Sequence, residues 1–167
     1  MKKIALFLVA AALFSGCSKE PTVTLFGVTL GDSVNTKDTG NFSIVEDEGR
    51  YITYSFSHTP EFCEKDNWEF CCSTLDGTIT SICGVFSTND VSTLNDRFEK
   101  CKKHILKFPG TEISNDSDVA IIVHKDFISH GQTNRICCCR YKVEHTINMF
   151  LSNFSIKDKV REIRKGK

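Results

Sequence analysis

The chain has 167 residues, and its 21 basic and 21 acidic side chains give a formal net charge of zero. A balanced charge creates no strong electrostatic field, so nucleic acid is not expected as a partner. The composition includes thirteen Phe and three Pro, which indicates a packed core rather than a disordered coat, and this length is typical of one domain.

The N-terminal segment predicts an export signal. Met1-Lys2-Lys3 is basic, and positions 4–14 form an uncharged apolar run of 11 residues. A helix needs roughly 20 apolar residues to cross a bilayer, whereas a signal-peptide core needs roughly 7–15. We therefore expect residues 1–16 to be a removable signal peptide. Without them, 151 residues remain with 19 basic and 21 acidic side chains, a net charge near −2.

The signal ends in Phe14-Ser15-Gly16-Cys17, which resembles the lipobox of bacterial lipoproteins, with Phe14 in a position where Leu is usual. The resemblance implies cleavage between Gly16 and Cys17 and attachment of diacylglyceryl and palmitate chains to Cys17. Two or more acyl chains hold a protein stably at a membrane. Ser18 stands where the family's inner-membrane retention signal has Asp, so the outer membrane is favoured. An ordinary secretory signal with an incidental cysteine is the alternative.

The mature chain is expected to consist of a tether, 17–23, followed by a single domain, 24–167. An extended apolar segment opens the domain at 25–31. Two strands are predicted at 42–46 and 51–56, where apolar and β-branched residues flank a polar turn.

Asp76-Gly77 predicts a two-residue hairpin turn between strands at 68–75 and 78–87, because both central positions of that turn need positive φ. A regular ladder from this turn gives one apolar face with Trp68, Phe70, Cys72, Ile79, Cys83 and Val85. The mixed face then carries Glu69, Cys71, Ser73, Thr80 and Ile82.

A helix of about five turns is predicted next, with Asn89-Asp90 as its cap. Its apolar stripe consists of Val91, Leu94, Phe98, Cys101, Ile105 and Phe108. We expect this stripe to pack on the Trp68/Phe70 face of the hairpin. The following segments are a polar loop at 111–118, strands at 119–127, 135–145 and 147–156, and a short basic tail at 157–167.

This order of elements predicts an α+β domain, an antiparallel β-sheet of about five to seven strands with one packed amphipathic helix.

Gly31-Asp32-Ser33 resembles the start of the nucleophile block of GDSL-type esterases, which implies Ser33 as a nucleophile. Such chemistry also needs a histidine, an orienting carboxylate and oxyanion donors. That family pairs its serine with Asp-x-x-His, and none of the five histidines here has Asp three residues before it. We therefore expect turn chemistry at Asp32-Ser33 and no enzyme activity. A membrane-tethered serine esterase using Ser33 is the alternative function.

Eight cysteines besides Cys17 remain: Cys63, Cys71, Cys72, Cys83, Cys101, Cys137, Cys138 and Cys139. An even number in an exported chain favours disulfides. Successive strand residues point to opposite faces, so Cys71 and Cys72 should not pair. Cys137 and Cys139 share a face near the upper limit of bridging distance. The core-facing set is expected to be Cys72, Cys83 and Cys101, and the pairing stays open.

Cys101 and His104 lie at i and i+3 of the predicted helix, as the ligands in some metal sites do. Two ligands do not make a tetrahedral site, and His104 is expected to be a solvated residue near the helix end. We expect no metal, no cofactor and no catalytic residue. The predicted function is that of a membrane-anchored envelope lipoprotein, a non-catalytic binding or accessory module whose partners are the membrane and other envelope proteins.

Overall fold

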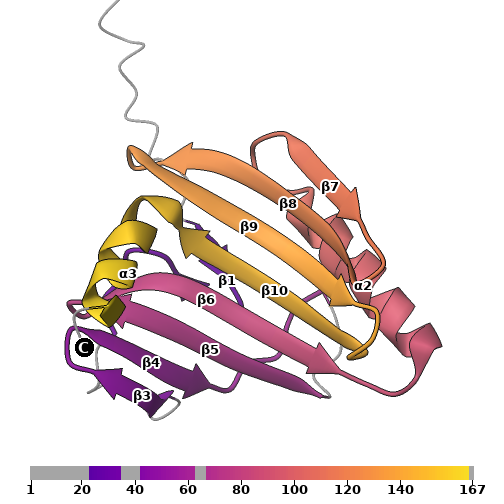
Figure 1. Ribbon diagram of the computed structural model, residues 1–167, viewed down its shortest axis with the longest axis horizontal. Helices are drawn as coiled ribbons and strands as arrows, with labels where there is room; N and C mark the ends of the chain where they lie inside the picture. The colour runs from indigo at the N-terminus through magenta and orange to yellow at the C-terminus, as the bar shows by residue number, and fades with distance from the viewer. Residues whose placement is uncertain (1–22, 35–41, 63–66, 166–167) are drawn as a thin grey trace, which may run out of the picture.

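The computed structural model describes residues 23–34, 42–62 and 67–165. These residues form an eight-stranded antiparallel sheet with the order β3-β4-β5-β6-β10-β9-β8-β7, a separate two-stranded hairpin, and the helices α2 and α3 (Figure 1). The large sheet consists of β3 (Phe42–Glu48), β4 (Tyr51–Phe56), β5 (Trp68–Leu75), β6 (Thr78–Ser87), β7 (Glu112–Asp116), β8 (Ala120–Ser129), β9 (Gln132–Tyr141) and β10 (Thr146–Asn153). The prediction of an α+β domain with an antiparallel sheet is confirmed.

The sheet is built from two meanders of four strands each. β3 to β6 pair in sequence order, β7 to β10 do the same, and the last strands of the two meanders, β6 and β10, pair with each other in the middle. Helix α2 (Val91–Ile105) connects the meanders. Because every pairing is antiparallel, residues directly opposite each other across strands share a face.

Helix α2 begins where the sequence predicts. The carboxylate of Asp90 accepts hydrogen bonds from the backbone N–H groups of Ser92 and Thr93, at 3.0 and 3.2 Å, and satisfies two of the free donors of the first turn. The helix ends at Ile105, before the predicted Phe108. Its buried stripe packs against β8, β9 and β10. The helix therefore covers the half of the core face that these strands form, and not the β5–β6 hairpin as expected.

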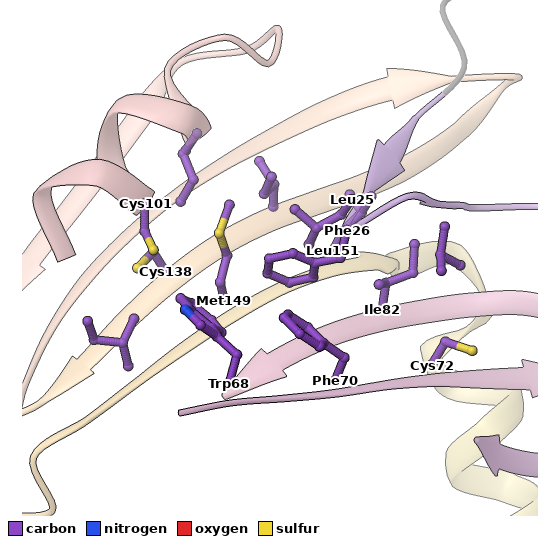
Figure 2. Packing of buried hydrophobic residues seen from close by; sticks show 14 of the residues in the cluster. Leu25, Phe26, Trp68, Phe70, Cys72, Ile82, Cys101, Cys138, Met149 and Leu151 are labelled. Carbon is purple, nitrogen blue, oxygen red and sulfur yellow. The ribbon is translucent and has the colours of Figure 1, made fainter. Parts of the chain in front are cut away.

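A small hairpin packs on the remaining half of the core face. Its strands are β1 (Thr24–Leu25) and β2 (Val28–Thr29), and Phe26 lies at the turn between them with φ 52°. The Phe26 ring centroid lies 4.8 Å from that of Phe70 and 5.7 Å from that of Trp68. Figure 2 shows this ring among the buried side chains of the sheet.

The predicted register of the β5–β6 hairpin holds at the turn and fails beyond it. Asp76 and Gly77 both have positive φ, 52° and 78°, as the turn requires. The ladder then shifts between Ser73 and Thr74, because Thr80 is an extra residue in β6. This β-bulge exchanges the two faces of the rest of the strand.

The bulge overturns part of the predicted core. Cys83 and Val85, which we expected in the core, lie on the opposite face. Ile82 and Phe86 are buried instead, at 0% and 1% exposure. Figure 2 shows Ile82 pointing into the core beside Phe70. Cys72 and Cys101 are buried as predicted.

The sheet has more strands than the five to seven predicted. β7 lies in the segment expected to be a polar loop, and all five of its residues are exposed, so this edge strand needs no apolar alternation. The strand predicted at 147–156 ends at Asn153, and its last three residues form a short 3-10 helix, η1 (Phe154–Ile156). The basic tail that follows contains helix α3 (Lys157–Lys165), which is longer than the one helical turn expected there. Among the described residues, no helix has the length and hydropathy of a membrane span.

Candidate functional site

The sheet face opposite α2, called here the outer face, is partly covered by the C-terminal segment (Figure 1). It carries Glu69, Cys71, Ser73, Ser81, Cys83, Val85, Arg135, Cys137, Cys139, Asn148, Phe150 and Ser152. A cavity of about 330 Å³ lies between this face and the C-terminal segment. It is lined by Tyr51, Thr80, Ser81, Arg135, Phe150, Ser152, Asn153, Phe154, Ile156 and Val160.

The C-terminal segment is held over the sheet by local hydrogen bonds. The backbone N–H of Thr133 on β9 donates to the hydroxyl of Ser155 at 3.1 Å, and the backbone N–H of Ser155 donates to Asn153 at 3.0 Å. Ile156 and Val160 are four residues apart, so they lie on the same side of the C-terminal segment, and both line the cavity. The segment therefore forms the apolar roof of the cavity.

Arg135 is the charged group of the cavity wall. Its guanidinium donates two hydrogen bonds to Asp126 on the adjacent strand β8, at 2.6 and 2.7 Å. It also lies over the Phe154 ring, 4.4 Å from the centroid. These hydrogen bonds hold the pKa of the Asp126 carboxyl below its usual range and raise the pKa of Arg135. Both groups are therefore charged at neutral pH, and the pair is oriented by two parallel bonds.

The lining can hold an apolar group and hydrogen-bond a polar one. Three aromatic and two aliphatic side chains supply the walls, while hydroxyls, an amide and one guanidinium supply the polar positions. Among these described lining residues there is no carboxylate, imidazole or thiol. Apolar walls with a few polar groups are typical of small-molecule binding sites. The described lining residues include the hydroxyls of Ser81 and Ser152.

The residues predicted to carry the lipid anchor, Gly16 and Cys17, lie outside the described residues, as do the signal peptide and most of the tether. Ser33 is described and exposed, and its backbone forms an isolated β-bridge with Thr78. The backbone carbonyl of the neighbouring Asp32 accepts a hydrogen bond from the N–H of Ile79 at 2.8 Å. Asp32-Ser33 thus fixes the segment after β2 to the start of β6.

Cys101 and His104 do not face a common site. Cys101 is fully buried against the sheet, whereas the His104 ring stacks on Phe62 with centroids 4.1 Å apart. His104 is half-buried rather than solvated as predicted, and this burial lowers the pKa of its imidazole. Within the described part of the chain, no group of three or more His, Cys, Asp or Glu side chains has an arrangement that could hold a metal ion.

Sequence reasoning missed the cavity because its residues are far apart in the chain. Tyr51, Arg135 and Val160 meet only through the pairing of β6 with β10 and the return of the C-terminal segment. One available signal was the apolar spacing of Ile156, Val160 and Ile163 in the basic tail, which is that of an amphipathic helix.

Comparisons of this chain with protein-family models, with curated proteins and with solved structures find no match.

Proposed function

We propose that this chain is an exported protein of the bacterial cell envelope, anchored through acyl chains on Cys17, whose domain binds a small amphipathic ligand without catalysing a reaction. The anchor rests on the lipobox resemblance of Phe14-Ser15-Gly16-Cys17. The same resemblance, with Ser18 after the cysteine, favours the outer membrane. A lipid anchor would place the domain beside a membrane and its amphipathic molecules.

The observation that carries the binding role is the cavity on the outer face. Its volume of about 330 Å³ lies at the lower end of the range of small-ligand sites, roughly 300–1,000 Å³. Phe150 and Phe154 offer ring surfaces, and Arg135 holds its charge at the wall. This combination suits a ligand with an apolar or aromatic body and one polar or anionic group, such as part of an amphiphile.

Energy transfer from the single tryptophan, Trp68, to a fluorescent probe tests this role. The full chain would be reconstituted in phosphatidylcholine vesicles and titrated with 1-anilinonaphthalene-8-sulfonate, an anionic aromatic amphiphile. We expect saturable transfer from Trp68, which separates probe bound to protein from probe dissolved in lipid.

Two matched variants locate the binding. Val160→Glu introduces a carboxylate into the roof, where desolvation and repulsion of the anionic probe should weaken binding at least about tenfold. Val143→Glu makes the same change at a side chain that is 81% exposed in the β9–β10 turn, and should leave binding unchanged. Equal affinities for the two variants would argue against the cavity as the site.

One observation favours the esterase alternative. Asp32 and His130 line a single cavity of about 530 Å³ beside the Ser33–Thr78 bridge. Hydrolysis of a p-nitrophenyl ester by the full chain, abolished in Ser33→Ala, would establish that alternative. Our proposal expects no turnover that depends on Ser33.

A further inference from the structure

Four cysteines lie on the outer face as two pairs. Cys71 on β5 is directly opposite Cys83 on β6, and Cys137 and Cys139 are two residues apart on β9. The first pair exists because of the bulge at Thr80, which turns Cys83 away from the core. The sequence alone places Cys71 and Cys83 on different faces, so only the structure brings them together.

The geometry of Cys71 and Cys83 suits a disulfide. Directly opposed residues of antiparallel strands have Cα atoms about 4.5–5.5 Å apart, and disulfides span Cα separations of about 4.4–6.8 Å. Both side chains leave the sheet on the same face, because residues directly opposite each other in an antiparallel pair point to the same side. The backbone therefore already places the two residues at a separation that disulfides span.

The pair is also accessible and activated. Cys71 and Cys83 are both only partly buried. The neighbouring Cys83 thiol lowers the pKa of the Cys71 thiol to about 7, so Cys71 is more often a thiolate at neutral pH than an ordinary cysteine is. The same contact, together with burial, raises the pKa of Cys83. A thiolate is the attacking species in disulfide exchange, which assigns the first attack to Cys71.

The other described cysteines lack either a suitable Cα separation or access to solvent. The Sγ atoms of Cys137 and Cys139 are 3.4 Å apart, but two strand rises separate their Cα atoms by about 6.7 Å, the upper limit for a disulfide. They are also only 3% and 6% exposed. Cys101 and Cys138 lie together in the core in Figure 2 and are both fully buried. Cys72 points into the core as well, at 1% exposure.

We propose that Cys71 and Cys83 form a reversible disulfide by exchange with a disulfide oxidant. The Cys71 thiolate attacks one sulfur of the oxidant, forms a mixed disulfide and releases the first thiolate. Cys83 then loses its proton to solvent and attacks the Cys71 sulfur, which closes the internal bond and releases the second thiolate. Two protein thiols are oxidised and one external disulfide is reduced to two thiols. This inference does not rest on the ligand-binding role.

A redox titration with glutathione tests the pairing. The reduced full chain in phosphatidylcholine vesicles would be equilibrated at increasing ratios of oxidised to reduced glutathione, quenched in acid, alkylated with iodoacetamide and cleaved before aspartate. Cleavage before Asp66, Asp76 and Asp90 gives the peptide 66–75, with Cys71 and Cys72, and the peptide 76–89, with Cys83. We expect these two peptides to become linked at lower oxidant ratios than any link involving Cys137 or Cys139.

Variants assign the link to one cysteine of the first peptide. Cys71→Ser should abolish it and Cys72→Ser should preserve it, with circular dichroism to verify the fold of each. A link that persists in folded Cys71→Ser would overturn the proposal. So would complete alkylation of Cys71 and Cys83 at the most oxidising ratio.

A second measurement needs no oxidation. At pH 7 Cys71 should react with iodoacetamide about tenfold faster than a thiol of ordinary pKa, since far more of it is thiolate. Cys83→Ala removes the neighbouring thiol that lowers the pKa of Cys71, so the pH profile of Cys71 alkylation should shift to higher pH. An unchanged profile would contradict the pairing even if Cys71→Ser failed to fold.

Discussion

The ammonium group of Lys125 on β8 donates a hydrogen bond to the carbonyl oxygen of Phe108 at 2.7 Å, just beyond the end of α2. A second contact, 3.3 Å long, joins the same ammonium to the carbonyl of Leu106. Lys125 is only 8% exposed. The side chain thus ties the segment that follows the helix to the sheet and satisfies two of its backbone carbonyls.

Lys125→Met removes both bonds and keeps the apolar stem. We expect the free energy of unfolding to fall by about 1–3 kcal/mol, because partly buried carbonyls lose a charged donor. Urea denaturation followed by circular dichroism measures this change. Lys142→Met is the control, since Lys142 pairs with an exposed carboxylate, Asp116, at 2.7 Å and should change stability by less than about 1 kcal/mol. Equal effects would show that the cap is unimportant.

Gly84 on β6 lies under the Phe26 ring. A Cβ atom at position 84 would stand 2.6 Å from Phe26 Cε2 and 3.2 Å from Phe70. Phe26 is 4% exposed and surrounded by aromatic rings, so it cannot move freely. Gly84→Ala should therefore destabilise the fold by about 1–3 kcal/mol, as measured by urea denaturation. The double variant Gly84→Ala, Phe26→Leu should lose less than the sum of the two single variants, and strict additivity would count against this contact.

His104 links stability to pH. Burial lowers the pKa of its imidazole, so the unfolded chain, with a pKa near about 6.5, binds the proton more tightly than the folded chain does. Stability is therefore unaffected well above pH 6.5 and is lost as pH falls from that value through the folded pKa. His104→Phe keeps an aromatic ring on Phe62 and should flatten the decline between about pH 7 and 5. Urea midpoints across this range test it, and an unchanged slope would contradict it. Burial lowers the pKa of His58 as well, so some slope should remain.

Local features of the fold were predictable from the sequence, whereas features that depend on tertiary pairing were not. The turn at Asp76-Gly77 and the cap at Asp90 depend on neighbouring residues, and both were predicted correctly. The bulge at Thr80 was not predictable from the sequence of β6, because apolar residues of that strand could face the core in either register. The register is decided by packing against Trp68, Phe70 and the rest of the core.

The site was harder to predict than the fold. In the sequence, Arg135 resembles any charged residue of a strand. Its place in the cavity wall depends on its contacts with Asp126 in β8 and with Phe154, which follows β10. Likewise, the polar edge strand β7 has no apolar pattern of its own, because it pairs through its backbone with β8. These features arise from tertiary pairing, which local patterns do not encode.

The central claim is that the chain is anchored through Cys17, and the mass of its mature N-terminus tests it most directly. The protein would be produced in a Gram-negative bacterium, extracted from membranes and measured intact and after proteolysis, beside a Cys17→Ala control. The account predicts an N-terminal peptide that begins at Cys17 and carries acyl chains, absent from the control. An unmodified Cys17 thiol, or a mature chain beginning at another residue, would contradict it.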